Sequence, residues 1–166
     1  MPKPRVATPF MLPATLALAG CAWNPVLEPY AIADAREQPA ARVATVWGVR
    51  DGAKLHFTHV DGVSLPSRGG GGYPVSLTLT PGDHELRIYF AGADHRWTER
   101  KLTTALEAGH TYVVEYLYLP ERAGVLIKLA DQGPDQQCRY ERVSAVSGAA
   151  TLLCAATVRA DGATEP

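Results

Sequence analysis

YPVSLTLTPGDHELRIYF, residues 73–90, carries the clearest structural pattern in this chain. Apolar side chains occupy every second position on both sides of Pro81-Gly82, with Val75, Leu77 and Leu79 before the pair and Leu86, Ile88 and Phe90 after it. Such alternation is typical of β-strands that bury one face. Proline followed by glycine suits the two central positions of a type II turn. The stretch therefore predicts a β-hairpin.

The same two-residue period continues on both sides of this stretch. Residues 42–49 and 53–60 flank Arg50-Asp51-Gly52, a step that suits a tight turn and predicts a second hairpin. Residues 102–119 repeat the design around Glu107-Ala108-Gly109, and residues 124–131 predict one more strand. Residues 139–158 are compatible with two strands or with a strand and a short helix. Tyr112, Val114, Tyr116 and Tyr118 share one predicted strand face, and Val113, Glu115, Leu117 and Leu119 share the other.

Many short strands with almost no helical period predict an all-β fold, namely a small antiparallel β-sandwich or a partly open barrel. The N-terminal residues have a different character. Lys3 and Arg5 precede an apolar run that ends near Gly20, and the run is too short, and too rich in proline, for a membrane-spanning helix. The order of charge, apolar run and small residues is that of a secretory signal peptide.

The run ends in Leu18-Ala19-Gly20-Cys21, which resembles the lipobox of bacterial lipoproteins. The resemblance implies that Cys21 carries diacylglycerol and that the chain is cut before it. Two or more acyl chains hold a protein stably on a membrane. Ala22 is not the aspartate that signals retention at the inner membrane in such lipoproteins, so the resemblance implies an outer-membrane protein that faces the periplasm.

The expected organisation has four parts: a signal peptide at 1–20, a lipidated tether at 21–41, a β-sandwich at 42–158 and a disordered tail at 159–166. The tether is assigned because residues 22–41 contain three prolines and no sustained period. The mature chain would hold 14 basic and 17 acidic residues, a net charge of −3, and its basic residues are scattered. This charge pattern argues against a nucleic-acid partner.

The two cysteines that remain after Cys21 is assigned to lipid are Cys138 and Cys154. In an oxidising periplasm they are expected to form a disulfide, although two separate buried thiols are the alternative. Their spacing is neither that of a redox motif nor that of a zinc site.

A second resemblance concerns the domain itself. Asp-Gly after a strand, then the L.L.PG.H.L.I pattern, then L.AGHTY.V, resembles the small β-sandwich modules of bacterial envelope lipoproteins, akin to PEGA-type domains. The matching positions are Asp61, Gly62, Leu77, Leu79, Pro81, Gly82, His84, Leu86, Ile88, Ala108, Gly109 and Tyr112. They span about a third of the chain, and Thr80-Pro81-Gly82-Asp83 replaces the turn for which the family is named. The matching residues are turn and core positions, so the resemblance implies a fold and no catalytic residue.

Candidate chemistry is sparse. The glycines of residues 68–73 lack the lysine and hydroxyl of a phosphate loop and predict a plain loop. His56 and His59 leave opposite faces of a strand unless a bulge intervenes. His84 and His110 each follow a turn, and a metal site between them, with Asp83 and Glu107, competes with ordinary turn histidines. The sequence predicts no catalytic residue, no cofactor and no metal.

The favoured functional hypothesis is a non-enzymatic envelope lipoprotein whose tethered β-sandwich serves as an adaptor for a protein or for peptidoglycan. The alternative is a periplasm-facing lipoprotein that binds a small ligand or a glycan through Tyr89, Trp97 and the tyrosine face of residues 112–118. Aromatic residues in strands are also common core residues, which is the competing explanation for Tyr89 and Trp97.

Overall fold

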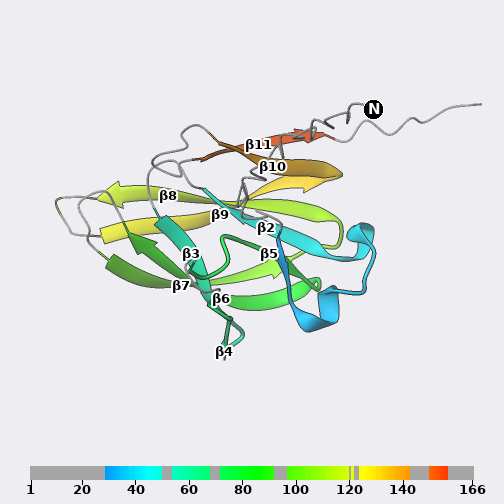
Figure 1. Ribbon diagram of the computed structural model, residues 1–166, viewed down its shortest axis with the longest axis horizontal. Coiled ribbons are helices and arrows are strands. Elements are labelled where there is room, and N and C mark those ends of the chain that lie inside the picture. The colour runs from blue at the N-terminus through cyan, green and yellow to red at the C-terminus, as the bar shows by residue number, and fades with distance from the viewer. Residues whose placement is uncertain are drawn as a thin grey trace, which may run out of the picture.

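Two β-sheets pack face to face, and a two-stranded ribbon lies over one of them (Figure 1). The computed structural model describes residues 29–49, 54–67, 72–91, 97–119, 121, 124–142 and 150–156. The five-stranded sheet has the order β1 (Tyr30–Ala31), β5 (Ser76–Leu79), β2 (Ala44–Gly48), β8 (His110–Leu119) and β9 (Gly124–Pro134). The four-stranded sheet has the order β4 (Val63–Ser64), β3 (Lys54–Val60), β6 (Gly82–Ala91) and β7 (Trp97–Leu106). The ribbon consists of β10 (Gln136–Arg142) and β11 (Ala150–Ala156).

The all-β sandwich that the sequence predicts is confirmed, but the predicted hairpins on either side of Pro81-Gly82 and Gly109 are wrong. β5 and β6, which flank Pro81, lie in different sheets, and so do β7 and β8, which flank Gly109. The two turns carry the chain across the core from one sheet to the other. The predicted pairing of residues 42–49 with 53–60 is also wrong, because β2 and β3 belong to opposite sheets.

These crossings explain why the sandwich is not purely antiparallel. When consecutive strands lie in different sheets, each sheet must find neighbours elsewhere in the chain. β2 therefore pairs with β8 in parallel, and β1 pairs with β5 in parallel. The hairpins within one sheet are β3–β4, β6–β7 and β8–β9, all antiparallel.

The core between the sheets is built from the alternating residues that the sequence indicates. Leu77 and Leu79 of β5 and Leu86, Ile88 and Phe90 of β6 are buried from opposite sides. The leucines and Ile88 pack with Val46, Leu55, Phe57, Leu106, Tyr112 and Val114, while Phe90 packs on Tyr116. Each such side chain contributes about 1.5–3 kcal/mol by leaving water. A turn that carries the chain from one sheet to the other still directs the apolar face of each strand into this core. The predictions of which side chains share a buried face therefore hold, although the predicted strand pairings are wrong.

The fold begins earlier in the chain than the sequence predicts. Tyr30 and Ala31 pair with β5, and the backbone N–H of Ile32 donates to the carbonyl oxygen of Thr78 at 3.0 Å. Two short 3-10 helices follow, η1 (Ala33–Ala35) and η2 (Ala40–Arg42), and Ala35 is 2% exposed. Residues 30–41, expected in the tether, therefore belong to the sandwich. The predicted signal peptide, Cys21 and the tail at 159–166 lie outside the described residues.

A buried tyrosine closes the corner between β7 and β8. The Tyr112 hydroxyl accepts a hydrogen bond from the backbone N–H of Glu107 at 2.9 Å, five residues upstream. This contact resembles the tyrosine corner of other β-sandwiches. Burial raises the pKa of the Tyr112 hydroxyl, and the carboxylates of Asp131 and Glu107 add to this effect, against the hydrogen bond from Glu107.

Candidate functional site

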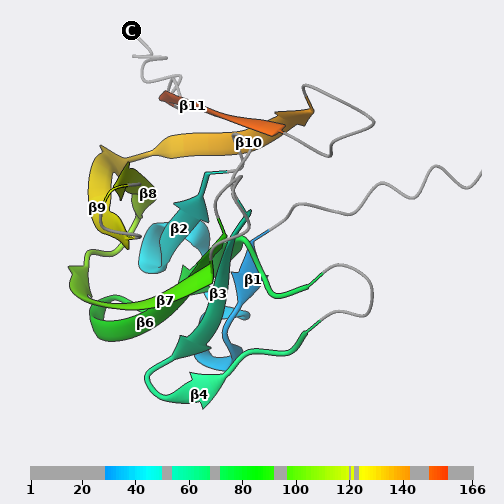
Figure 2. The same ribbon diagram turned by 90° about the vertical axis from the view of Figure 1, so that its left-hand side faces the viewer.

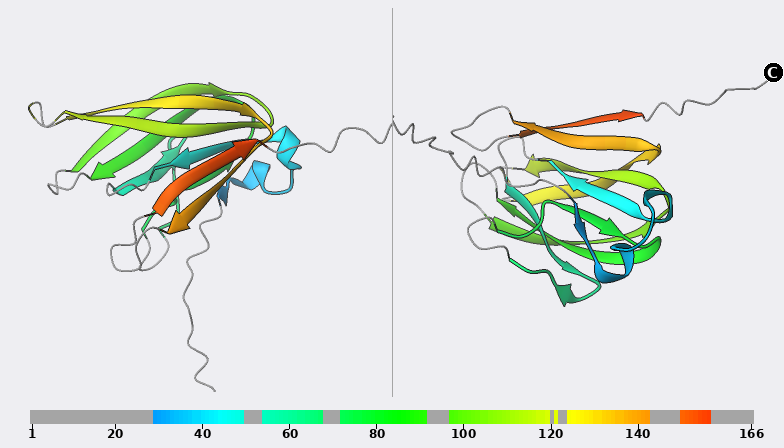
Figure 3. Two further views of the ribbon diagram at one scale, coloured as in Figure 1. Left: turned by 90° about the horizontal axis from the view of Figure 1, so that it is seen from above. Right: turned by 45° about the vertical axis from the view of Figure 1, so that its right-hand side comes forward.

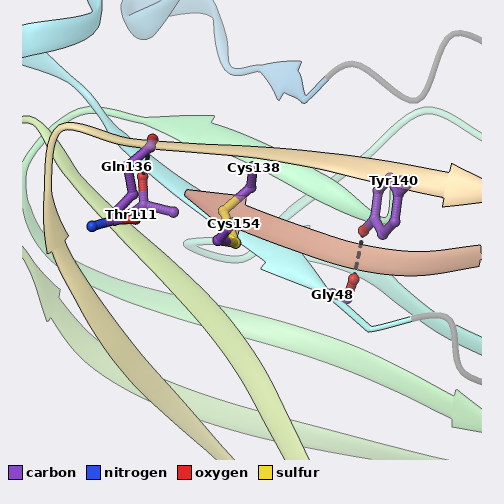
Figure 4. Close-up of a disulfide and its surroundings, with 6 residues drawn as sticks. All are labelled: Gly48, Thr111, Gln136, Cys138, Tyr140 and Cys154. Atoms are coloured by element: carbon purple, nitrogen blue, oxygen red, sulfur yellow. Dashed lines mark hydrogen bonds between the residues drawn. A yellow bond between two sulfur atoms is a disulfide. The ribbon is translucent and has the colours of Figure 1, made fainter. Parts of the chain in front are cut away.

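The C-terminal ribbon is held together by the predicted disulfide. Cys138 and Cys154 are directly opposite each other on β10 and β11, with an S–S distance of 1.99 Å and Cα atoms 4.1 Å apart (Figure 4). The close Cα spacing is that of a non-hydrogen-bonded antiparallel pair. The segment between the cysteines thus returns as a second strand, which settles the choice between a strand and a helix for residues 150–156.

The ribbon forms a third layer over the outer face of the five-stranded sheet (Figure 2). The Tyr140 hydroxyl donates to the carbonyl oxygen of Gly48, and it lies 3.3 Å from the carbonyl oxygen of Val75. The Tyr140 ring meets Trp47 edge-on with 5.3 Å between ring centroids. Trp47 alternates with the core residue Val46 and so faces away from the core, yet it is only 6% exposed. The ribbon is what covers it.

The ribbon also contacts the neighbouring strand of the same sheet, because the Thr111 hydroxyl on β8 donates to the Gln136 carbonyl oxygen at 3.2 Å. Seen from above, the ribbon then runs at an angle to β8 and β9 and diverges from them (Figure 3). The outer face of these two strands keeps exposed apolar residues. Leu117 and Leu126 are cross-strand partners, and each is 59% exposed.

The sequence places Leu117 on the face that Val113, Glu115 and Leu119 share, but the alternation alone does not tell which face of the strand meets the core. The structure puts the opposite face, with Tyr112 and Val114, inward. On the exposed face Lys128 of β9 forms an ion pair with Glu115 of β8, with 2.7 Å between Nζ and Oε2. The outer face of β8 and β9 thus carries an apolar cross-strand pair beside an ion pair.

Tyr112 and Tyr116, on the tyrosine face that the alternative hypothesis uses for ligand binding, point into the sandwich. Tyr112 is buried in the core, and Tyr116 packs on Phe90 with 4.8 Å between ring centroids. Tyr89 is half-buried on β6, between His56 of β3 and Glu99 of β7. The Trp97 backbone pairs with Ala91 at the start of β7, while its side chain lies outside the described part. The described residues therefore do not join Tyr89 and the tyrosine face into one surface.

The structure gives His84 and His110 different carboxylate partners. His84 Nδ1 lies 2.7 Å from Asp61 Oδ2, and its Nε2 lies 2.9 Å from the carbonyl oxygen of Thr80. His110 Nδ1 lies 2.9 Å from Asp131 Oδ2, and its Nε2 lies 3.5 Å from Glu107 Oε2. Both histidines thus connect turns to neighbouring strands through polar contacts, as ordinary turn histidines do.

The other two strand histidines lie beside an actual bulge, since the register between β3 and β6 shifts between Phe57 and His59. His56 Nδ1 lies 2.9 Å from the Tyr73 carbonyl oxygen, and His59 Nδ1 lies 3.0 Å from the Thr58 hydroxyl. Within the described residues, no group of three or more histidine, cysteine or acidic side chains has the arrangement of a metal site.

Asp61 lies in the turn between β3 and β4 and connects this turn to β6 through its carboxylate. Asp61 and Gly62 have φ angles of 51° and 79°, the left-handed conformation that a two-residue hairpin turn of type I′ requires. The Asp61 carboxylate accepts the backbone N–H of Glu85 at 2.8 Å as well as the His84 contact. Burial acts to raise the pKa of Asp61, but the hydrogen bonds from Glu85 and His84 and the charge of His84 outweigh it, so the pKa lies below 3.8.

Among the described residues, no helix has both the length and the apolar composition needed to span a membrane. Comparison of the chain with protein-family models, with curated proteins and with solved structures found no match in any of the three. Function is therefore inferred from the residues and their geometry.

Proposed function

We propose that this protein is a non-enzymatic lipoprotein of the bacterial cell envelope, anchored through Cys21, whose β-sandwich serves as an adaptor for another envelope protein or for peptidoglycan. The observation that carries the proposal is the partnership of the cysteines. Cys138 and Cys154 are bonded to each other, so Cys21, at the end of the lipobox-like Leu18-Ala19-Gly20, is the one cysteine left over. An export signal and a disulfide both fit an oxidising compartment.

The start of the fold supports a close attachment to the membrane. The first described strand of the sandwich begins at Tyr30, so at most eight residues separate the sandwich from Cys21 rather than the twenty of the predicted tether. Even fully extended, nine peptide steps reach about 30 Å. An acylated Cys21 would therefore keep the domain beside the bilayer, and the absence of aspartate at position 22 supports the outer membrane with the domain in the periplasm.

A binding role fits the features of the described surface better than a catalytic one. His84 and His110 are engaged in turns, while Leu117 and Leu126 present an exposed apolar pair on a regular sheet. The fully buried centre of a protein interface is more apolar than its rim, and a leucine pair on a regular sheet fits such a centre.

The test of anchoring is metabolic labelling of the full chain in a Gram-negative host. Wild type is expected to incorporate labelled fatty acid and to lose its first 20 residues, whereas Cys21→Ala stays uncut and unlabelled. The doubly substituted Cys138→Ala, Cys154→Ala chain is the matched control, because it also loses cysteine yet keeps position 21. Acyl incorporation by the Cys21→Ala chain would contradict the proposal.

The adaptor role is tested separately, by cross-linking in intact cells and by sedimentation with purified peptidoglycan sacculi. Specific capture of one envelope protein, or retention on sacculi, is expected. A chain that is acylated but binds neither would refute the adaptor role while leaving the anchor intact.

A further inference from the structure

Strand β9, at one edge of the five-stranded sheet, differs from the other three described edge strands of the sandwich in length and charge. Edge strands of native sheets are usually protected by being short or by carrying charges, because an exposed edge pairs with other strands. β1 and β4 are two residues long, and β7 carries Glu99, Arg100 and Lys101 in succession. β9 is 11 residues long, and between Gly124 and Ala130 it carries a single charge, Lys128. β9 is thus a long, apolar edge.

The contacts of β9 show which backbone groups face outward. Arg100 Nε donates to the Val125 carbonyl oxygen at 3.3 Å from the side of β7, so that carbonyl points away from β8. Because backbone groups alternate in direction along a strand, Ile127 and Leu129 present their N–H and C=O groups to the same side. In the part of the chain that the structure describes, no strand pairs with this side of β9.

We propose that the partner of this edge is a second copy of the same chain, which adds its own β9 antiparallel across a twofold axis at Leu126. In this register Val125 pairs with Ile127 of the other copy, and both residues have their backbone groups directed outward. The two Leu126 side chains meet at the axis, and each is flanked by its own Leu117. The exposed leucine pair of one copy thus becomes a row of four across a continuous sheet.

The positions of Lys128 and Leu126 select this register. With the axis at Leu126, Lys128 lies opposite Gly124 of the other copy, which adds no charge, and its ion pair with Glu115 persists. An axis at Lys128 would set the two lysines against each other, and an axis at Ile127 would set each lysine against a leucine. Like charges directly opposite each other on neighbouring strands are destabilising.

The hydrogen bond from Arg100 occupies one of the two acceptor positions of the Val125 carbonyl oxygen. A carbonyl oxygen has two lone pairs, so Val125 can accept a hydrogen bond from a second strand as well as from Arg100. Pairing of the two edges does not require the anchor, although an anchor would raise the local concentration of the two copies.

Engineered disulfides in intact cells test the register with the full chain. At the axis, two opposed residues have Cα atoms about 4.5 Å apart, the spacing of a non-hydrogen-bonded pair. The chain's own Cys138–Cys154 pair has this geometry. Leu126→Cys is therefore expected to give a disulfide-linked dimer. Lys128→Cys is the matched control on the same face, because its two copies would lie about 14 Å apart, four residues out of register. Equal dimer yields from the two variants, no dimer from either, or a disulfide between the Leu126→Cys chain and a different protein would overturn the proposal.

A second measurement does not depend on an added cysteine. Two differently tagged full-length copies are expected to co-purify from detergent-solubilised membranes. Leu126→Lys in both copies places two like charges at the axis and should reduce co-purification at least about tenfold. Leu153→Lys removes a leucine that is 40% exposed on β11, away from the interface, and should leave co-purification unchanged. Loss of co-purification in both variants, or in neither, would refute the interface.

Discussion

Loss of the Cys138–Cys154 disulfide should open the ribbon and leave the sandwich folded. The bond closes a loop of 15 residues, and in the chain-entropy model a loop of this length is worth about 3 kcal/mol. A two-stranded ribbon on its own is marginally stable. The described contacts that remain after reduction include those of Tyr140 with Gly48 and Trp47 and the Thr111 hydrogen bond, worth about 1 kcal/mol for each hydrogen bond. The stabilisation that the disulfide supplies exceeds each of these contacts.

The assay is hydrogen exchange of the protein with the disulfide intact, after reduction, and in the Cys138→Ala, Cys154→Ala variant. Amide protection in residues 136–142 and 150–156 should fall by roughly 100-fold, the ratio that corresponds to about 3 kcal/mol. Protection in the core strands β6 and β8 should change little, because their core side chains pack between the two sheets rather than against the ribbon. Two results would contradict this account: an equal loss of protection throughout both sheets, or an unchanged ribbon.

Three further changes test other contacts. Tyr112→Phe leaves the ring in place but removes the acceptor of the Glu107 N–H, so the free energy of unfolding should fall by about 1 kcal/mol in urea titrations; an unchanged midpoint would show that this hydrogen bond does not stabilise the corner. Because the pKa of Asp61 is lowered in the folded state, its contribution to stability is present above about pH 4 and is lost as the pH falls below that value. Asp61→Asn keeps a residue that tolerates the left-handed turn, so acid unfolding curves of wild type should approach those of the variant as the pH falls below about 4, and curves that stay parallel would contradict the assignment. Phe57→Ala, at a fully buried position, should cost about 3–5 kcal/mol by thermal or urea unfolding, and a cost below about 1 kcal/mol would place Phe57 outside the core.

The N-terminal boundary of the fold could not be located from composition. Residues 22–41 contain prolines and no period, which is the composition of a linker. Yet Ala35 is buried, and Tyr30 and Ala31 form an edge strand, because a segment of two residues can pair with β5 without any detectable alternation. Short edge elements are stabilised by the sheet that they join, so their own sequence carries little signal.

The exposed leucine pair was likewise not predictable from the sequence. Leu117 and Leu126 have the same apolar character as their buried neighbours, and alternation assigns each to a face without stating which face meets the second sheet. The disulfide between Cys138 and Cys154 was predictable, because assigning Cys21 to lipid leaves no other intramolecular pair. That the two cysteines lie directly opposite each other on β10 and β11 was not predictable.

Local sequence is enough to establish that this chain forms strands, where most of them lie, and which side chains share a face, because a period of two residues follows from the local geometry of the backbone. Which strands pair is set by the tertiary fold. A turn such as Thr80-Pro81-Gly82-Asp83 can return the chain beside its predecessor or carry it across the core, and both routes bury Leu79 and Leu86. The choice depends on contacts between residues far apart in the chain, among them the parallel pairing of β2 with β8, and no local pattern encodes those contacts.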